Sequence, residues 1–133
     1  MYPFSFTKVV SESDALTAGA KGGRYIAGGT TLVDLMRETV ERPQSVIDIN
    51  SLPYRGIEFG RNLVVGALVR MTELAEHPLV GARIPAIKQA LELSASAQLR
   101  NMASIGGNLM QRPRCLYFRD VTSPCNRDRK SVV

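Results

Sequence analysis

The chain has 133 residues, of which 44% are hydrophobic and 22% are charged, as in an ordinary globular domain. No apolar run reaches the roughly 20 residues that a membrane span needs, and the first residues lack the charged and apolar regions of a signal peptide. Two cysteines are too few for a secreted disulfide framework, so a cytoplasmic protein is expected.

The net charge of +5 lies in the last quarter of the chain. Residues 1–99 hold ten basic and ten acidic residues, whereas residues 100–133 hold seven basic and two acidic ones. A basic segment is one mark of a nucleic-acid-binding protein, but this segment lacks interleaved aromatic residues and a recognition helix. A segment that faces an anionic cofactor, an acidic partner or water is the simpler interpretation.

The first half of the chain alternates short strands with helices. Three runs have the composition of strands, at residues 4–9, 24–27 and 45–49. The helices between them are expected at residues 12–21 and 31–41. Ser11 precedes the first helix as an N-cap, with Asp14 three residues on, and Pro43 ends the second helix.

The second half is predicted to begin with a β-hairpin whose strands, residues 56–59 and 62–66, are joined at Gly60 and Arg61. A short helix, a longer amphipathic helix, an extended segment and an irregular tail should follow, at residues 72–77, 85–97, 99–105 and 112–133. Thr72 is the expected N-cap of the short helix.

Two glycine pairs interrupt this pattern in similar settings. The first is IAGGTTLVDL at residues 26–35, between a strand and a helix, and the second is ASIGGNL at residues 103–109. The first turn of a helix leaves N–H groups unpaired, and glycines let the backbone approach a phosphate. The lysine of a P-loop and the GxGxxG pattern of a Rossmann site are missing. A tight turn explains one pair, but two pairs favour a nucleotide diphosphate held from two sides.

The stretches AGGTTLVDLM and LRNMASIGGNL resemble the flavin-binding subunit or domain of the molybdenum hydroxylases, which include xanthine dehydrogenase, aldehyde oxidoreductases and carbon monoxide dehydrogenase. The resemblance implies an α+β fold, the N-terminal part of the two-lobed FAD-binding fold of the vanillyl-alcohol oxidase or PCMH type. It also implies that both segments bind the FAD pyrophosphate. The residues carried over are Ala27, Gly28, Gly29, Thr30, Thr31 and Leu32 from the first segment, and Ser104, Gly107, Asn108 and Leu109 from the second.

The resemblance extends over residues 1–126 and implies a domain organisation. One incomplete FAD-binding domain is expected over residues 1–133. Its parts would be a first lobe at about residues 1–55, the start of a second lobe at about residues 56–111, and a cysteine-containing loop at residues 112–133. Flavin subunits of the family are much longer, so the chain is expected to be truncated.

The function that the resemblance implies is electron transfer. In the family, the flavin passes electrons between iron–sulfur centres and an external acceptor, while the substrate is oxidised at a molybdenum centre on another chain. The implied partners are a large subunit with the molybdenum cofactor and a small [2Fe–2S] subunit, with no nucleic acid and no membrane. Export to the periplasm with a partner subunit is compatible with this scheme. The alternative is a non-catalytic remnant or assembly module that binds FAD weakly or not at all.

The segment GGNLMQRPRCLYFRDVTSPCNR resembles flavin subunits that carry an additional [4Fe–4S] cluster. Cys115 and Cys125 match the first of its four thiolate ligands, and no third or fourth cysteine is present, so the site is expected to be vestigial. Both thiols are expected to be accessible on an irregular loop, with neighbouring arginines favouring the thiolate. A zinc site fails for the same reason, because tetrahedral zinc needs four ligands.

Overall fold

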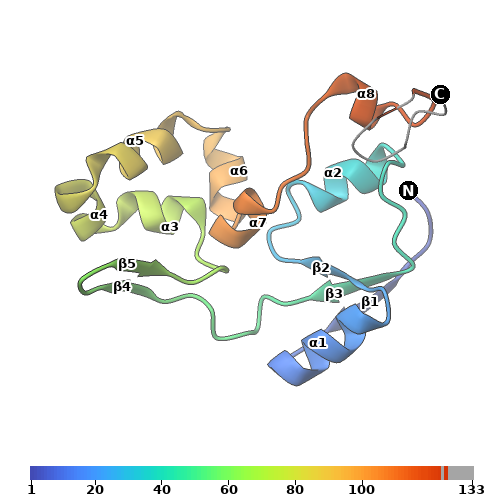
Figure 1. Ribbon diagram of the computed structural model, residues 1–133, viewed down its shortest axis with the longest axis horizontal. Helices are drawn as coiled ribbons and strands as arrows, with labels where there is room; N and C mark the ends of the chain where they lie inside the picture. The colour runs from blue at the N-terminus through green and yellow to red at the C-terminus, as the bar shows by residue number, and fades with distance from the viewer. Residues whose placement is uncertain (124, 126–133) are drawn as a thin grey trace.

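The computed structural model describes residues 1–123 and 125. Figure 1 shows a three-stranded sheet towards one end of the molecule and a hairpin covered by short helices towards the other. The strands are β1 (Ser5–Lys8), β2 (Arg24–Ile26), β3 (Ser45–Asp48), β4 (Ile57–Phe59) and β5 (Leu63–Val65). The helices are α1 (Glu12–Ala20), α2 (Leu32–Arg37), α3 (Met71–Glu76), α4 (Pro78–Arg83), α5 (Pro85–Leu93), α6 (Ala97–Met102), α7 (Ile105–Leu109) and α8 (Leu116–Arg119).

The three-stranded sheet is parallel, with the order β1-β3-β2. Its register pairs Thr7 of β1 and Tyr25 of β2 with Ile47 of the central strand. Because side chains alternate across a strand, Val46 and Ile47 face opposite sides of the sheet, and both are buried. Ile47 packs with Ala15 of α1, whereas α2 lies on the other side of the sheet in Figure 1. The two helices supply the crossovers that parallel strands require.

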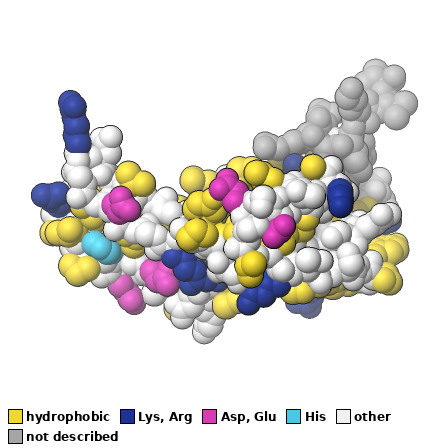
Figure 2. All heavy atoms as spheres, turned by 90° about the horizontal axis from the view of Figure 1, so that it is seen from below, with side chains coloured by type: hydrophobic (Ala, Val, Ile, Leu, Met, Phe, Trp, Pro, Cys, Tyr) yellow, Lys and Arg dark blue, Asp and Glu magenta, His cyan; other side chains and the backbone are white. Residues whose placement is uncertain are grey.

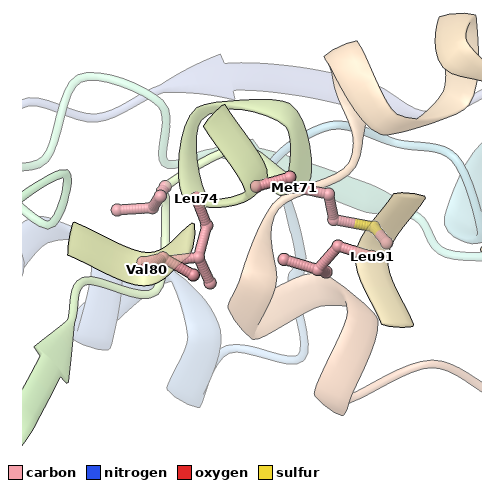
Figure 3. Close-up of a cluster of buried hydrophobic side chains, with 6 residues drawn as sticks. Met71, Leu74, Val80 and Leu91 are labelled. Carbon is pink, nitrogen blue, oxygen red and sulfur yellow. The ribbon is translucent and has the colours of Figure 1, made fainter. Parts of the chain in front are cut away.

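The hairpin and helices α3 to α5 enclose a second hydrophobic core. Strands β4 and β5 are antiparallel and joined by a tight turn, as predicted. Figure 3 shows Met71, Leu74, Val80 and Leu91 brought together from α3, α4 and α5. Burial of each such side chain stabilises the fold by about 1.5–3 kcal/mol, so these short helices depend on their shared core rather than on their own length.

Leu68 connects the two parts of the molecule. It follows β5, yet it packs in the cluster beneath the first sheet with Val9, Ala15, Ile47 and Leu52. The two parts therefore share buried surface. The division into lobes at about residue 55 stays a prediction.

Several predicted elements are confirmed with shorter bounds. Ser11 caps α1, and its hydroxyl accepts a hydrogen bond of 3.1 Å from the N–H of Asp14. The longer amphipathic helix, α5, ends at Leu93 because Ser94 leaves the helical conformation. Part of the expected irregular tail, residues 124 and 126–133, lies outside the described residues.

Three predictions about helices were wrong. Helix α3 begins after Arg70 rather than Thr72, because the Glu73 carboxylate accepts a 2.7 Å hydrogen bond from the Arg70 N–H. Helix α6 replaces most of the expected extended segment, since Ser96 caps it by accepting the N–H of Leu99. Helix α8 lies in the expected irregular tail. Helices of four to six residues show too little periodicity for the sequence pattern to identify them.

Helix α2 ends four residues earlier than predicted. The N–H of Val40 donates to the carbonyl of Leu35 at 2.9 Å, and the N–H of Thr39 donates to the carbonyl of Met36 at 3.2 Å. This pair of bonds is the Schellman motif, and Thr39 occupies its left-handed position with a φ of 63°. Glycine usually fills that position, which explains why no sequence signal marks the end of the helix there.

No helix in the described part of the chain combines the length and the apolar character needed to cross a membrane. On the face of the molecule shown in Figure 2, basic, acidic and hydrophobic side chains are interspersed rather than gathered by type. The described basic side chains therefore do not form a single basic surface on this face.

The left-handed conformation of Thr39 makes it a site for stabilisation. We expect Thr39→Gly to raise the free energy of unfolding by about 1 kcal/mol, because a β-branched residue is strained at this φ whereas glycine is not. Urea denaturation followed by circular dichroism measures the change. Thr17→Gly within α1 is the matched control and should lower stability by about 0.5 kcal/mol. Destabilisation by both variants would contradict the assignment of strain to Thr39.

Candidate functional site

The first glycine segment forms the turn between β2 and α2. Gly29 has a φ of +73°, which a side chain would disfavour, and its carbonyl accepts the N–H of Val33 at 2.9 Å. The N–H groups of Thr30, Thr31 and Leu32 donate to no acceptor in the described part of the chain. These free donors at a helix start are suited to an anion.

The second glycine segment begins α7 and is bonded mainly to protein. Ser104 is only 2% exposed, and its hydroxyl accepts a 3.1 Å hydrogen bond from the N–H of Gly107. The N–H of Ile105 donates to the Val69 carbonyl, and the N–H of Gly106 to the Ala67 carbonyl, both at 2.8 Å. The segment is therefore fixed to the chain that enters α3.

The two segments touch at Gly28. A Cβ atom at this position would lie on the carbonyl oxygen of Met102, the last residue of α6. The absence of a side chain thus lets the first segment pack on the backbone that precedes the second. Gly28 is required for this contact within the protein, whereas the sequence had indicated close approach to a phosphate.

Asn50 and Arg70 strengthen the same junction. The side-chain amide of Asn50 donates to the Ala27 carbonyl at 2.9 Å and to the Asp48 carboxylate at 2.7 Å. The Arg70 guanidinium donates to the Asn50 amide oxygen at 2.8 Å and also to the Met102 carbonyl. Burial lowers the pKa of Arg70 from its ordinary value, and the charge of Arg55 acts in the same direction.

Two adjoining cavities open beside this junction. The first has a volume of about 510 Å³ and the second about 660 Å³. Residues that line the first include Thr30, Thr31, Ala95, Leu99, Asn108 and Arg114. Residues that line the second include Gly28, Gly29, Thr30, Leu99, Met102 and Arg114. Both glycine segments therefore contribute to the first cavity, and Thr30, Leu99 and Arg114 are common to both cavities.

The predicted site residues divide into two groups. Gly28, Gly29, Thr30, Thr31 and Asn108 line one or both cavities. The remaining five do not line either cavity: Ala27, Leu32, Ser104, Gly107 and Leu109. Of these, the Ala27 carbonyl is bonded to Asn50, Ser104 and Gly107 are bonded to each other, and Leu109 is 79% exposed. The binding roles expected from the resemblance stay predictions.

Sequence reasoning missed the residues that shape the first cavity from α5 and α6. Ala95 lines this cavity with a φ of 50°, an unusual conformation for a residue with a side chain. The Arg100 guanidinium donates to the carbonyls of Ser94 and Ala95, at 2.9 and 3.0 Å, and so holds the turn. No sequence signal marks this turn, because it lacks the glycine that such a φ normally requires.

The cysteine segment is ordered against α2 as far as α8. Arg119 forms ion pairs with Asp34 and Glu38, at 2.7 and 2.8 Å, and the hydrogen bond to Asp34 is the main cause that raises the pKa of Arg119. Phe118 packs in a buried cluster with Leu35. The segment between α7 and α8 is thereby held beside the cavities.

The two cysteines lie in different environments. Cys115 is exposed at the start of α8, whereas Cys125 is buried with Leu35 and Phe118 at 7% exposure. The expectation that both thiols are accessible is wrong, because Cys125 contributes to this apolar cluster. Among the described residues, no group of three or more His, Cys, Asp or Glu side chains could hold a metal ion. Two thiolates do not fit a four-ligand cluster, and their assignment as vestigial ligands stays a prediction.

The contact at Gly28 predicts a large effect of a single methyl group. We expect Gly28→Ala to lower the free energy of unfolding by about 2 kcal/mol or more, since the new Cβ must displace the Met102 backbone. Gly60→Ala is the matched control, because a Cβ there meets no atom within 4 Å, and it should change stability by less than about 0.5 kcal/mol. Equal denaturation midpoints for the two variants would refute the contact.

The burial of Cys125 predicts unequal thiol reactivity. Under native conditions Cys115 should react with an aromatic disulfide reagent at least about tenfold faster than Cys125, because the thiolate must be accessible to attack. In Cys115→Ala only the slow phase should remain, and in Cys125→Ala only the fast one. Two equally fast phases in the unaltered chain would show that Cys125 is not protected.

Comparison with known proteins identifies the family. Residues 2–130 match the family model described as the FAD binding domain in molybdopterin dehydrogenase. The chain is 42% identical over 131 residues to the aldehyde oxidoreductase FAD-binding subunit PaoB of Escherichia coli (strain K12), covering 96% of this chain and 41% of that protein. It is 35% identical over 111 residues to the carbon monoxide dehydrogenase medium chain of Hydrogenophaga pseudoflava, and the match covers 81% of this chain and 39% of that protein.

Solved structures agree with this relation. Carbon monoxide dehydrogenase from Hydrogenophaga pseudoflava superposes with a TM-score of 0.76 and 34% identity, covering 82% of this chain and 40% of that one. Quinoline 2-oxidoreductase from Pseudomonas putida 86 gives the same TM-score at 26% identity, and the match covers 81% of this chain and 39% of that one. The predicted fold class is confirmed, and the chain spans about two fifths of the length of these relatives. The chain belongs to the family of FAD-binding domains of the molybdopterin dehydrogenases.

Proposed function

We propose that this chain forms part of an FAD-binding electron-transfer subunit of a molybdenum-dependent oxidoreductase of the aldehyde or xanthine type. The observation that carries the proposal is the meeting of the two glycine segments beside two adjoining cavities, in a chain whose family is defined by FAD binding. Thr30, Thr31 and Asn108 bring polar groups from both segments to the first cavity.

The donors at this junction suit the diphosphate of FAD. The N–H groups of Thr30, Thr31 and Leu32 lack acceptors within the described residues, and the hydroxyls of Thr30 and Thr31 form no hydrogen bond there. Unpaired donors at the start of a helix attract an anion, and the glycines before them leave the backbone open. These groups would hold the diphosphate, and FAD when bound would supply the redox chemistry.

The cavity linings favour a relay of electrons rather than acid–base catalysis. Among the described lining residues, Asp34 is the one carboxylate, and its side chain is paired with Arg119 at 2.7 Å. The linings contain no histidine within the described part of the chain. In the electron-transfer scheme that we propose, these cavities would hold FAD, and oxidation of the substrate would take place on a different subunit.

The names of the relatives support a multisubunit assembly. The Escherichia coli relative is named as an FAD-binding subunit and the Hydrogenophaga relative as a medium chain. We infer that this chain works with a large subunit that carries the molybdenum cofactor and a small [2Fe–2S] subunit. Electrons would pass through FAD between the iron–sulfur centres and an external acceptor.

Titration of the purified chain with FAD tests the proposal. Flavin fluorescence should be quenched on binding, and FAD at a hundredfold excess over its dissociation constant should raise the free energy of unfolding by about 2.7 kcal/mol. The double variant Thr30→Val/Thr31→Val removes two hydroxyls at nearly constant volume. Because hydrogen bonds to charged groups are strong, it should weaken FAD binding by about tenfold or more.

Thr7→Val on the exposed strand β1 is the matched control and should bind FAD as the unaltered chain does, since Thr7 lines neither cavity. A folded chain that binds no FAD would contradict the proposal and would favour the assembly module. Equal affinities of all three proteins would place FAD elsewhere.

A further inference from the structure

Arg114 occupies a particular place in the segment between α7 and α8. It lines both cavities, together with Thr30 of the first glycine segment and Leu99 of α6. A ligand that extends from one cavity into the other would therefore pass between Thr30 and Arg114. The N–H of Thr30 donates to no acceptor among the described residues.

Among the described residues, no carboxylate compensates the charge of Arg114. Arg112 forms an ion pair with Glu41 at 3.8 Å, and Arg119 is paired with two carboxylates of α2. In residues 1–123 and 125, no carboxylate pairs with Arg114. Arg37 also has no ion pair in this part of the chain, but it lines only the second of the two cavities. Arg114 is thus the uncompensated cation common to both cavities among the described residues.

The surrounding structure holds Arg114 in this place. After Arg114 the chain enters α8, which is fixed to α2 by the ion pairs of Arg119 and by burial of Phe118. Arg112, two residues before Arg114, places its guanidinium 5.1 Å from the centre of the Phe118 ring. The segment that precedes Arg114 is therefore attached to α8 through the Phe118 ring, and α8 is attached in turn to α2.

We propose that Arg114 binds the diphosphate of a dinucleotide that lies across the two cavities, and that it makes the site selective for FAD over flavins without phosphate. This inference rests on the proposed function. A guanidinium offers a planar pair of N–H donors that matches phosphate oxygens, and its charge does not depend on pH in the neutral range. It adds a full positive charge to the partial charges of the N–H groups at the start of α2.

Binding of FAD and riboflavin to four proteins tests this role: the unaltered chain, Arg114→Gln, Arg114→Lys and Arg61→Gln. Arg61 lies in the hairpin turn, is exposed and lines neither cavity, so Arg61→Gln reproduces the loss of charge away from the site. Arg114→Gln should weaken FAD binding by about tenfold or more. Arg114→Lys should weaken it by less, because lysine keeps the positive charge but lacks the planar pair of N–H donors. Arg61→Gln should leave FAD affinity unchanged.

Two further measurements separate a charge contact from a structural role. The affinity of the unaltered chain for FAD should fall as salt is raised, and that of Arg114→Gln should fall less, because screening acts on the contact that the variant has lost. Riboflavin, which has the same ring but no phosphate, should bind the unaltered chain and Arg114→Gln equally. The thermal midpoint without ligand should be the same for both, because Arg114 is exposed.

The outcomes distinguish this inference from the proposed function. If Arg114→Gln and Arg114→Lys bind FAD as tightly as the unaltered chain, while Thr30→Val/Thr31→Val binds more weakly, the role of Arg114 is overturned and the FAD site stands. If Arg61→Gln weakens binding as much as Arg114→Gln, the effect is one of net charge and the role is again overturned. If the unaltered chain binds no FAD, both are overturned. If Arg114→Gln fails to fold, Arg114→Lys replaces it in the test. The role is then overturned if Arg114→Lys has the same FAD affinity and the same salt dependence as the unaltered chain.

Discussion

One guanidinium and one amide hold together the segments on which the cavities depend. Arg70 donates to the Asn50 side chain and to the Met102 carbonyl, and Asn50 donates in turn to the Ala27 carbonyl. The end of β2, the loop after β3, the start of α3 and the end of α6 are thereby joined through two side chains. Loss of one partner would leave part-buried polar groups unsatisfied, at a cost of about 1–3 kcal/mol each. The junction thereby joins the chain beside the first glycine segment to the chain that precedes the second, and both segments line the first cavity.

The same junction means that the site is shaped by protein contacts before any ligand enters. Gly28 packs on the Met102 backbone, and Ser104 is bonded to Gly107 within α7. Each contact fixes a segment that ligand binding would otherwise have to order. A site that is already ordered loses less conformational entropy on binding, and this favours affinity. The strained turn at Ala95, held by Arg100, contributes to the same preorganisation from the α5 side.

The elements that could be predicted from sequence are those whose signals are local and conventional. The three strands of the first sheet, the hairpin and the Ser11 cap of α1 follow directly from composition and spacing. The features that were missed depend on contacts between residues far apart in sequence, or have an unusual residue at a position where a turn is made. Helices α6 and α8 are too short to show a period and depend on packing, and the end of α2 has threonine where glycine is usual. The links through Asn50 and Arg70 join residues far apart in sequence, which no local pattern reports.

The glycine motifs predict backbone approach to a ligand, and the structure shows that two of these glycines contact the protein itself. The sequence suggested that the glycines themselves approach the ligand, but Gly28 approaches Met102, and Gly107 donates its N–H to Ser104. The polar groups that have no partner among the described residues are those of their neighbours, the N–H groups and hydroxyls of Thr30 and Thr31. The glycines therefore act by bringing the two segments together, and the residues beside them present the donors. A binding motif of this kind combines a packing requirement with a chemical one, and the structure is needed to assign each residue to its part.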